Sequence, residues 1–138
     1  MNYTASQSST LVSANDSVTI TVKLPPLGIT ITSVPTKGTS GFARGTVAGI
    51  IPSAYSTYNV AVYIYVANGW WNKPYFATPA TTIASDGTWS TNIATGGNDI
   101  SATEIRAYLI PSTSIIPLIN GGPISSFLSG YIYSSVTR

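Results

Sequence analysis

The chain of 138 residues contains no cysteine and no histidine, and these two absences exclude several kinds of chemistry. Without cysteine, the chain forms no disulfide and offers no thiolate to a metal ion. Without histidine, it lacks the usual general base and the most common metal ligand. We therefore expect no metal and no other cofactor.

Charge is also scarce. Charged residues make up 7% of the chain, whereas an average soluble domain has about 25%. Six basic residues against four acidic ones give a net charge of +2, and the basic residues are scattered along the sequence. Because nucleic-acid-binding proteins carry clustered basic residues, we expect no nucleic-acid partner. The low net charge also offers little electrostatic resistance to close packing of several copies.

Long apolar runs are missing as well. No stretch reaches the ~20 apolar residues that span a bilayer, so we expect no membrane insertion. The first residues, "MNYTASQSSTLVS", lack the basic and apolar regions of a signal peptide. If such a peptide has been removed, the protein is extracellular or at the cell surface. The alternative location is a virion that assembles inside a host cell.

What the sequence does have is short segments in which apolar and polar residues alternate, the pattern of half-buried strands. The predicted strands are 17–24, 28–34, 41–50, 58–66, 102–110 and 129–138, with a hairpin at 81–93. No longer segment shows a helical period. The chain is therefore predicted to be all-β, an Ig-like antiparallel β-sandwich of about eight strands. Residues 1–16 are predicted to be a flexible polar tail, and residues 17–138 a single domain.

The strand at 58–66 has the clearest pattern. Its valines and isoleucine share one face, whereas Tyr63 and Tyr65 lie on the other. This predicts a central strand with the core on one face and a covered or ligand-facing surface on the other. In the hairpin at 81–93, Asp86-Gly87 supplies the tight turn and Trp89 is expected in the core. Gly45 and Gly49 indicate a bulge or a close backbone approach.

Residues 111–128, "PSTSIIPLINGGPISSFL", are apolar but rich in proline and glycine. A long loop with so many large apolar side chains should not extend into water. We expect it to cap the end of the sandwich; otherwise it presents a contact patch to another subunit.

The four acidic residues do not form a pattern typical of catalysis. Asp86 belongs to a turn, Asp16 lies in the tail, and Glu104 and Arg106 suggest a surface ion pair on one strand. Asp99 lies in a Gly-Gly-Asn-Asp loop, where side-chain to backbone bonds are a simpler explanation than a calcium site with Asn98. No histidine is present to activate a serine, so the chain is predicted not to be an enzyme.

The segment "VYIYVANGWWNKPYF" (62–76) concentrates aromatic rings. Neighbours in a strand point to opposite faces, so Trp70 and Trp71 cannot both enter one core. If the strand phase continues from Val66, Trp70 points inward and Trp71 outward; Gly69 leaves this choice open. An exposed ring beside polar groups suits a sugar, whose C–H surface contacts the ring face. The predicted carbohydrate-binding residues are Trp70, Trp71, Asn72, Lys73 and Tyr75. The alternative is a cluster that only stabilises the fold.

From "ITITSVP" (29–35) onward, the chain resembles a family of Ig-like β-sandwich accessory modules in bacterial extracellular and surface proteins. The likeness is carried by "ARGTVAGIIPSAY", "YNVAVYIYVANGWWNKPYF", "IASDGTWSTNIATGGND" and "ATEIRAYLIP". Some modules of this family accompany polysaccharide-active enzymes, so the resemblance implies a non-catalytic module that binds carbohydrate. The strand "SVTITVKL" and segment 111–128 depart from the family pattern and favour a free-standing structural subunit.

Two functions follow. The first is a non-catalytic extracellular module that binds a polysaccharide or another glycan surface through exposed aromatic rings. The second is a structural subunit of an extracellular filament, or a virion decoration protein, that assembles as a homo-oligomer or with another partner. Its contacts would be edge strands and the apolar loop, since an exposed edge can extend a neighbour's sheet. The predicted assembly contacts are Val18, Ile20, Val22, Ile115, Ile116 and Phe127.

Overall fold

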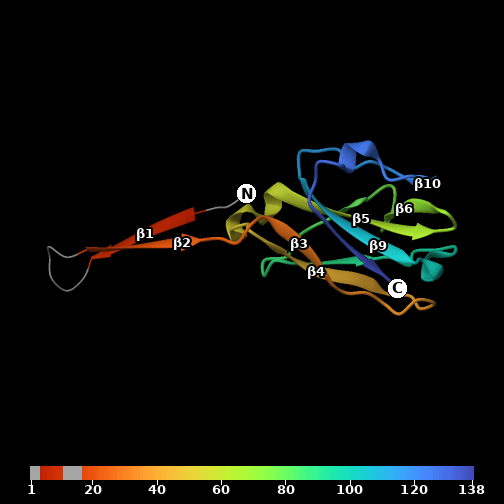
Figure 1. Ribbon diagram of the computed structural model, residues 1–138, viewed down its shortest axis with the longest axis horizontal. Helices are drawn as coiled ribbons and strands as arrows, with labels where there is room; N and C mark the ends of the chain where they lie inside the picture. Colours follow the sequence, from red (N-terminus) through yellow and green to blue (C-terminus); the bar gives the residue numbers. More distant parts are fainter. Residues whose placement is uncertain (1–3, 11–16) are drawn as a thin grey trace.

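The structure, a computed structural model, describes residues 4–10 and 17–138. Two antiparallel sheets, one of six strands and one of three, pack face to face (Figure 1). This arrangement confirms the predicted all-β sandwich. The connections include three short 3₁₀ helices, η1 (Pro52–Thr57), η2 (Asp99–Ser101) and η3 (Ser126–Leu128).

The larger sheet has the order β10-β6-β5-β9-β11, and β7 also pairs with β5. The smaller sheet has the order β3-β4-β8. The larger sheet consists of β5 (Tyr58–Val66), β6 (Gly69–Lys73), β7 (Ala80–Thr81), β9 (Glu104–Pro111), β10 (Asn120–Gly122) and β11 (Tyr133–Thr137). The smaller sheet consists of β3 (Gly28–Ser33), β4 (Phe42–Ala48) and β8 (Thr88–Asn92).

The main core lies between the two sheets. Alternate residues of β5 and β9 point into it, as period-2 strands require. Trp89 from β8 and Ile29 from β3 meet them from the smaller sheet. The predicted inward faces of 58–66 and 102–110 and the core position of Trp89 are confirmed. The core residues of β5 and β9 are Val60, Val62, Ile64, Val66, Ile105, Ala107 and Leu109.

Gly45 of β4 lies in close contact with the backbone of β3 and with the ring of Trp89. A Cβ atom added there would be 2.0 Å from the Thr30 carbonyl oxygen and 2.4 Å from the Trp89 ring. The β3–β4 register shifts between Ile31 and Ser33, beside this contact. The expected close approach is confirmed at Gly45, whereas the register shift leaves its extra residue on β3; the missing side chain makes room for the indole.

A second apolar cluster covers the outer face of the larger sheet. Ile119 and Leu128, from the segment after β9, are buried there against Tyr63 and Tyr108. Segment 111–128 was expected to cap the end of the sandwich, and this prediction of its position is wrong. The segment lies over a sheet face, because several outward residues of β5 and β9, such as Tyr63, Tyr108 and Ile110, are large and mostly apolar and need cover.

The predicted hairpin at 81–93 forms only its turn. Asp86 Oδ1 accepts bonds from the Thr88 hydroxyl (2.6 Å) and amide (3.1 Å), and these bonds lower the pKa of Asp86. Gly87 has a φ of +82°. However, β7 pairs with β5 and β8 pairs with β4, so the segments before and after the turn belong to different sheets.

Strand 17–24 was expected in the sandwich. It forms β2 (Ser17–Lys23), which pairs instead with β1 (Thr4–Thr10) in a separate two-stranded sheet. Figure 1 shows this hairpin extending away from the sandwich. Residues 4–10 thus form a strand where a tail was expected. Residues 1–3 and 11–16 of that predicted tail lie outside the described residues.

Candidate functional site

The β5–β6 hairpin decides where the two neighbouring tryptophans point. Its turn residues, Ala67 and Asn68, have φ values of +52° and +64°, as a two-residue type I′ turn requires. The register pairs Val66 with Gly69, Tyr65 with Trp70 and Ile64 with Trp71. Trp71 therefore faces inward with Ile64, and Trp70 outward with Tyr65. These orientations are opposite to those expected if the strand alternation continued from Val66. The two-residue turn pairs Val66 with Gly69, so the inward face carries even-numbered residues in β5 and odd-numbered residues in β6.

Trp70 packs on the outer face of the larger sheet and is 8% exposed. The Arg106 guanidinium lies 4.6 Å from its ring centroid, and the Tyr65 ring lies 5.3 Å away in an edge contact. Arg106 also forms the predicted ion pair with Glu104, at 2.7 Å. The ring of Trp70 is thus used in packing, and the structure does not bring it to the same surface as Trp71.

Trp71 lies at the margin of the main core and is half-buried. Its indole Nε1 donates a hydrogen bond to the Val66 carbonyl oxygen (3.1 Å), which fixes the orientation of the ring. Gly121 of β10 lies beside the ring, where an added Cβ would be 3.0 Å from the indole. The ring is therefore held in place before any ligand arrives.

Asn72 is buried and serves the fold. Its amide donates to the Pro117 carbonyl oxygen (3.0 Å), and its Oδ1 accepts a bond from the Ile119 amide. The side chain thus ties the covering segment to β6. This predicted carbohydrate-binding residue is only 4% exposed and so presents little surface to a ligand.

Lys73 is also buried, and its ammonium group forms an ion pair with Asp99. The same ammonium donates to the Thr95 hydroxyl at 2.9 Å. Asp99 Oδ2 further accepts bonds from the amides of Thr95 (3.0 Å) and Gly96 (3.1 Å). These bonds confirm that side-chain to backbone contacts hold this loop.

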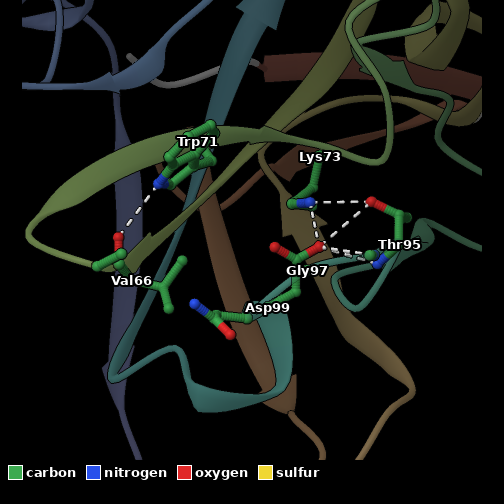
Figure 2. A pocket seen from close by; sticks show the side chains of 9 residues that line it. Val66, Trp71, Lys73, Thr95, Gly97 and Asp99 are labelled. Carbon is green, nitrogen blue, oxygen red and sulfur yellow. Dashed lines mark hydrogen bonds and ion pairs between the residues drawn. The ribbon is translucent and has the colours of Figure 1, made fainter.

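Two clefts flank Trp71. The loop cleft has a volume of about 390 Å³ and lies between Trp71, the β5–β6 turn and the loop 95–99. Figure 2 shows the indole on one side of it and the cluster of Lys73, Thr95 and Asp99 on the other. The aromatic cleft has a volume of about 320 Å³ and is lined by residues 71–76 and Thr95.

Sequence reasoning missed several residues of these clefts. Phe76, 45% exposed, stands in the aromatic cleft beside Tyr75, which is 55% exposed. Asn98 and Asp99 line the loop cleft although they lie more than twenty residues after Trp71 in the sequence. Phe76 is one of the aromatic residues of segment 62–76, so its part in the cleft could have been predicted. The sequence gives no sign, however, that loop 95–99 lies against β6.

The carboxylate of Asp99 keeps one oxygen for a ligand. All bonds that the described residues donate to it end on Oδ2. Oδ1 is therefore free to accept a hydroxyl group from the loop cleft. Within residues 4–10 and 17–138, no three histidine, cysteine, aspartate or glutamate side chains group as metal ligands would. The arrangement suits binding of a polar, uncharged molecule.

The apolar segment also carries a groove of about 610 Å³, lined chiefly by Ile115, Leu118 and Phe127. These side chains are 90%, 59% and 82% exposed, respectively. Ile116 instead packs against the outer-face cluster. Of the predicted assembly contacts, Ile115 and Phe127 are thus brought together at one surface. The side chains of Val18, Ile20 and Val22 lie outside the part of the structure that is described.

Comparison with known proteins finds no matching family model, no matching curated protein and no matching solved structure. Among the described residues, none of the helices has the length and apolar character needed to cross a membrane.

Proposed function

We propose that this chain is a non-catalytic carbohydrate-binding β-sandwich whose site consists of the two clefts beside Trp71. The observation that carries the proposal is the indole of Trp71, which is fixed by its bond to Val66 and lines both clefts. An aromatic face contacts the C–H surface of a sugar ring, and polar neighbours bind its hydroxyl groups. We further propose that the protein acts outside the cell or at the cell surface, where a polysaccharide ligand would be met.

The polar groups around Trp71 support binding rather than proton transfer. Asp99 Oδ1 accepts a hydroxyl group, and the exposed side chain of Asn98 offers both a donor and an acceptor. The Asp99 carboxylate is already paired with the Lys73 ammonium through Oδ2, so what it offers a ligand is the hydrogen-bond acceptor Oδ1. Tyr75 and Phe76 add apolar ring surface on the other side of the indole.

The proposal is tested by binding to a panel of glucans and xylans, with titration calorimetry for soluble ones and co-sedimentation for insoluble ones. We expect the native chain to bind at least one polysaccharide and Trp71→Ala to lose most of that binding. Phe42→Ala is the control, because it removes another exposed aromatic ring, which lies on β4 and lines neither cleft. A circular dichroism spectrum like that of the native chain serves to show that each variant is folded. Absence of binding to every polysaccharide contradicts the proposal.

A second function, a self-assembling structural subunit, is favoured by one specific observation. Ile115, Leu118 and Phe127 expose large apolar surfaces around a groove that carries no charged residue. Contiguous apolar surface of this kind marks contact sites. We propose a second copy of the chain as the partner, because the low charge of the whole chain imposes little repulsion between copies.

Size-exclusion chromatography with light scattering tests this second function. We expect an oligomer that dissociates when Ile115 and Phe127 are both changed to serine. Deletion of residues 1–24 shows in addition whether the β1–β2 hairpin takes part. A monomer at high concentration, in the native chain and in the deletion variant alike, contradicts self-assembly.

A further inference from the structure

The loop cleft and the aromatic cleft are neighbours on one surface. They share three lining residues, Trp71, Lys73 and Thr95. Their volumes, about 390 and 320 Å³, lie near the lower limit of the ~300–1,000 Å³ typical of small-molecule pockets. Each cleft thus has room for one small unit, and the two together have room for a chain of units that passes Trp71.

The two clefts offer different contacts. The aromatic cleft presents Tyr75 and Phe76, which are about half exposed, and so provides ring faces for stacking. The loop cleft presents Asp99 Oδ1, the side chain of Asn98 and the glycine loop, and so provides polar partners for hydroxyl groups. A ligand unit in one cleft therefore gains mainly apolar contact, whereas a unit in the other gains mainly hydrogen bonds.

The combined site carries no net charge. Lys73 and Asp99 are the charged residues that line the two clefts, and they neutralise each other in a buried ion pair. An acidic sugar would meet the Asp99 carboxylate without a free cation beside it, because the Lys73 ammonium is already engaged. Unpaired like charges in a binding site oppose association. The electrostatics therefore favour an uncharged ligand over a uronate or a sulfated sugar.

Building on the carbohydrate-binding function above, we propose that the ligand is a neutral oligosaccharide that crosses Trp71, with one sugar unit in each cleft. The indole, fixed by its bond to the Val66 carbonyl, separates the two units and contacts both. The loop 95–99 holds one unit by its hydroxyl groups, and the rings of Tyr75 and Phe76 stack against the other.

The test is calorimetric titration of the folded full-length chain with gluco- and xylo-oligosaccharides of increasing length, and with galacturonate oligomers as the acidic comparison. We expect affinity to rise roughly tenfold or more from the monosaccharide to the disaccharide, because the second unit adds stacking and buried area. Tyr75→Ala is expected to reduce this ratio several-fold. The control Phe42→Ala is expected to keep the ratio of the native chain.

The possible failures can be told apart. Equal affinity for monosaccharide and disaccharide overturns the two-unit site but leaves carbohydrate binding intact. Tighter binding of galacturonate than of the neutral oligomers overturns the neutral ligand class alone. Absence of binding to every oligosaccharide and every polysaccharide of the panel overturns the proposed function, and this inference with it.

Discussion

Lys73 brings a charge into a molecule that has few, and it depends on Asp99 for compensation. The side chains of this pair are 8% and 12% exposed. Removing one partner of a buried pair leaves an uncompensated charge, so we expect Lys73→Met to lower the free energy of unfolding by about 3–5 kcal/mol. Urea denaturation followed by tryptophan fluorescence measures this change. Glu104→Gln, in the more exposed pair with Arg106, should cost less than about 1 kcal/mol. Equal losses in the two variants would contradict the structural role given to Lys73.

Tyr63 should make the protein sensitive to alkaline pH. Burial raises the pKa of Tyr63, and its hydroxyl donates to the Pro117 carbonyl oxygen at 2.7 Å. The folded state therefore keeps this proton at a pH where the unfolded chain, with a tyrosine pKa of about 10, has lost it. The contribution to stability is complete below pH ~10 and declines as pH rises above that value.

The variant Tyr63→Phe isolates this effect from that of the other tyrosines. At neutral pH it should be less stable than the native chain by about 0.5–1.5 kcal/mol, because one hydrogen bond is lost. Above pH ~10 the difference should shrink, because loss of the Tyr63 proton then stabilises the unfolded state of the native sequence, whereas the Tyr63→Phe variant has no such proton to lose. Urea unfolding between pH 8 and 11 measures it. A difference that is constant across this range would show that Tyr63 titrates normally in the folded chain.

At the scale of the element, β4 depends on the absence of a side chain at Gly45. We expect Gly45→Ala to cost about 3 kcal/mol or more, because the new methyl group would overlap the Thr30 carbonyl and the Trp89 ring. Gly130→Ala is the control, since an added Cβ there meets nothing within 4 Å. Thermal melts of both variants measure the difference. A melting temperature of Gly45→Ala close to that of the control would contradict the close packing.

The segment between β9 and β11 should depend on Asn72. Asn72→Ala removes both bonds that tie Pro117 and Ile119 to β6, at a cost of about 1–3 kcal/mol. The Ile119 amide should then exchange its hydrogen much faster, whereas amides in β5 should keep their protection. Hydrogen exchange followed by mass spectrometry distinguishes the two regions. Unchanged exchange at Ile119 would show that the segment is held by its apolar contacts alone.

The sequence indicated the strands better than their pairing. The alternation in 58–66 predicted β5 and its two faces correctly, because burial on one side imposes a period of two. It did not predict the orientation of Trp70 and Trp71, which depends on a turn at Ala67 and Asn68. Asn68 tolerates a positive φ, but Ala67 does not favour one, and the pair Asn68-Gly69 would indicate a turn one residue later than the observed one. The division of 81–93 between two sheets was hidden for a similar reason: pairing is a property of distant strands.

At the scale of the whole molecule, the candidate site forms where loop 95–99 meets β6, and the local sequence pattern does not predict this contact. The sequence shows the aromatic and polar side chains of Trp71, Lys73 and Tyr75 close together in segment 62–76. Their surroundings are formed by loop 95–99, which lies against β6 in the folded chain. Asp99 of this loop pairs with Lys73, so the lysine that was predicted to contact a ligand takes part in a structural ion pair. The covering segment over the outer face was likewise recognisable as apolar, but its position required knowledge of which face of β5 lacked a partner.

The most direct test uses the three tryptophans as reporters in one NMR titration. Each indole N–H gives its own resonance, and Trp70 and Trp89 are buried in packing whereas Trp71 lines both clefts. On addition of a neutral oligosaccharide that binds the chain, we predict that the Trp71 resonance shifts in a saturable manner and that the other two remain in place. Movement of Trp70 or Trp89 instead, or no movement of any indole at saturating glycan, would contradict a sugar site at Trp71.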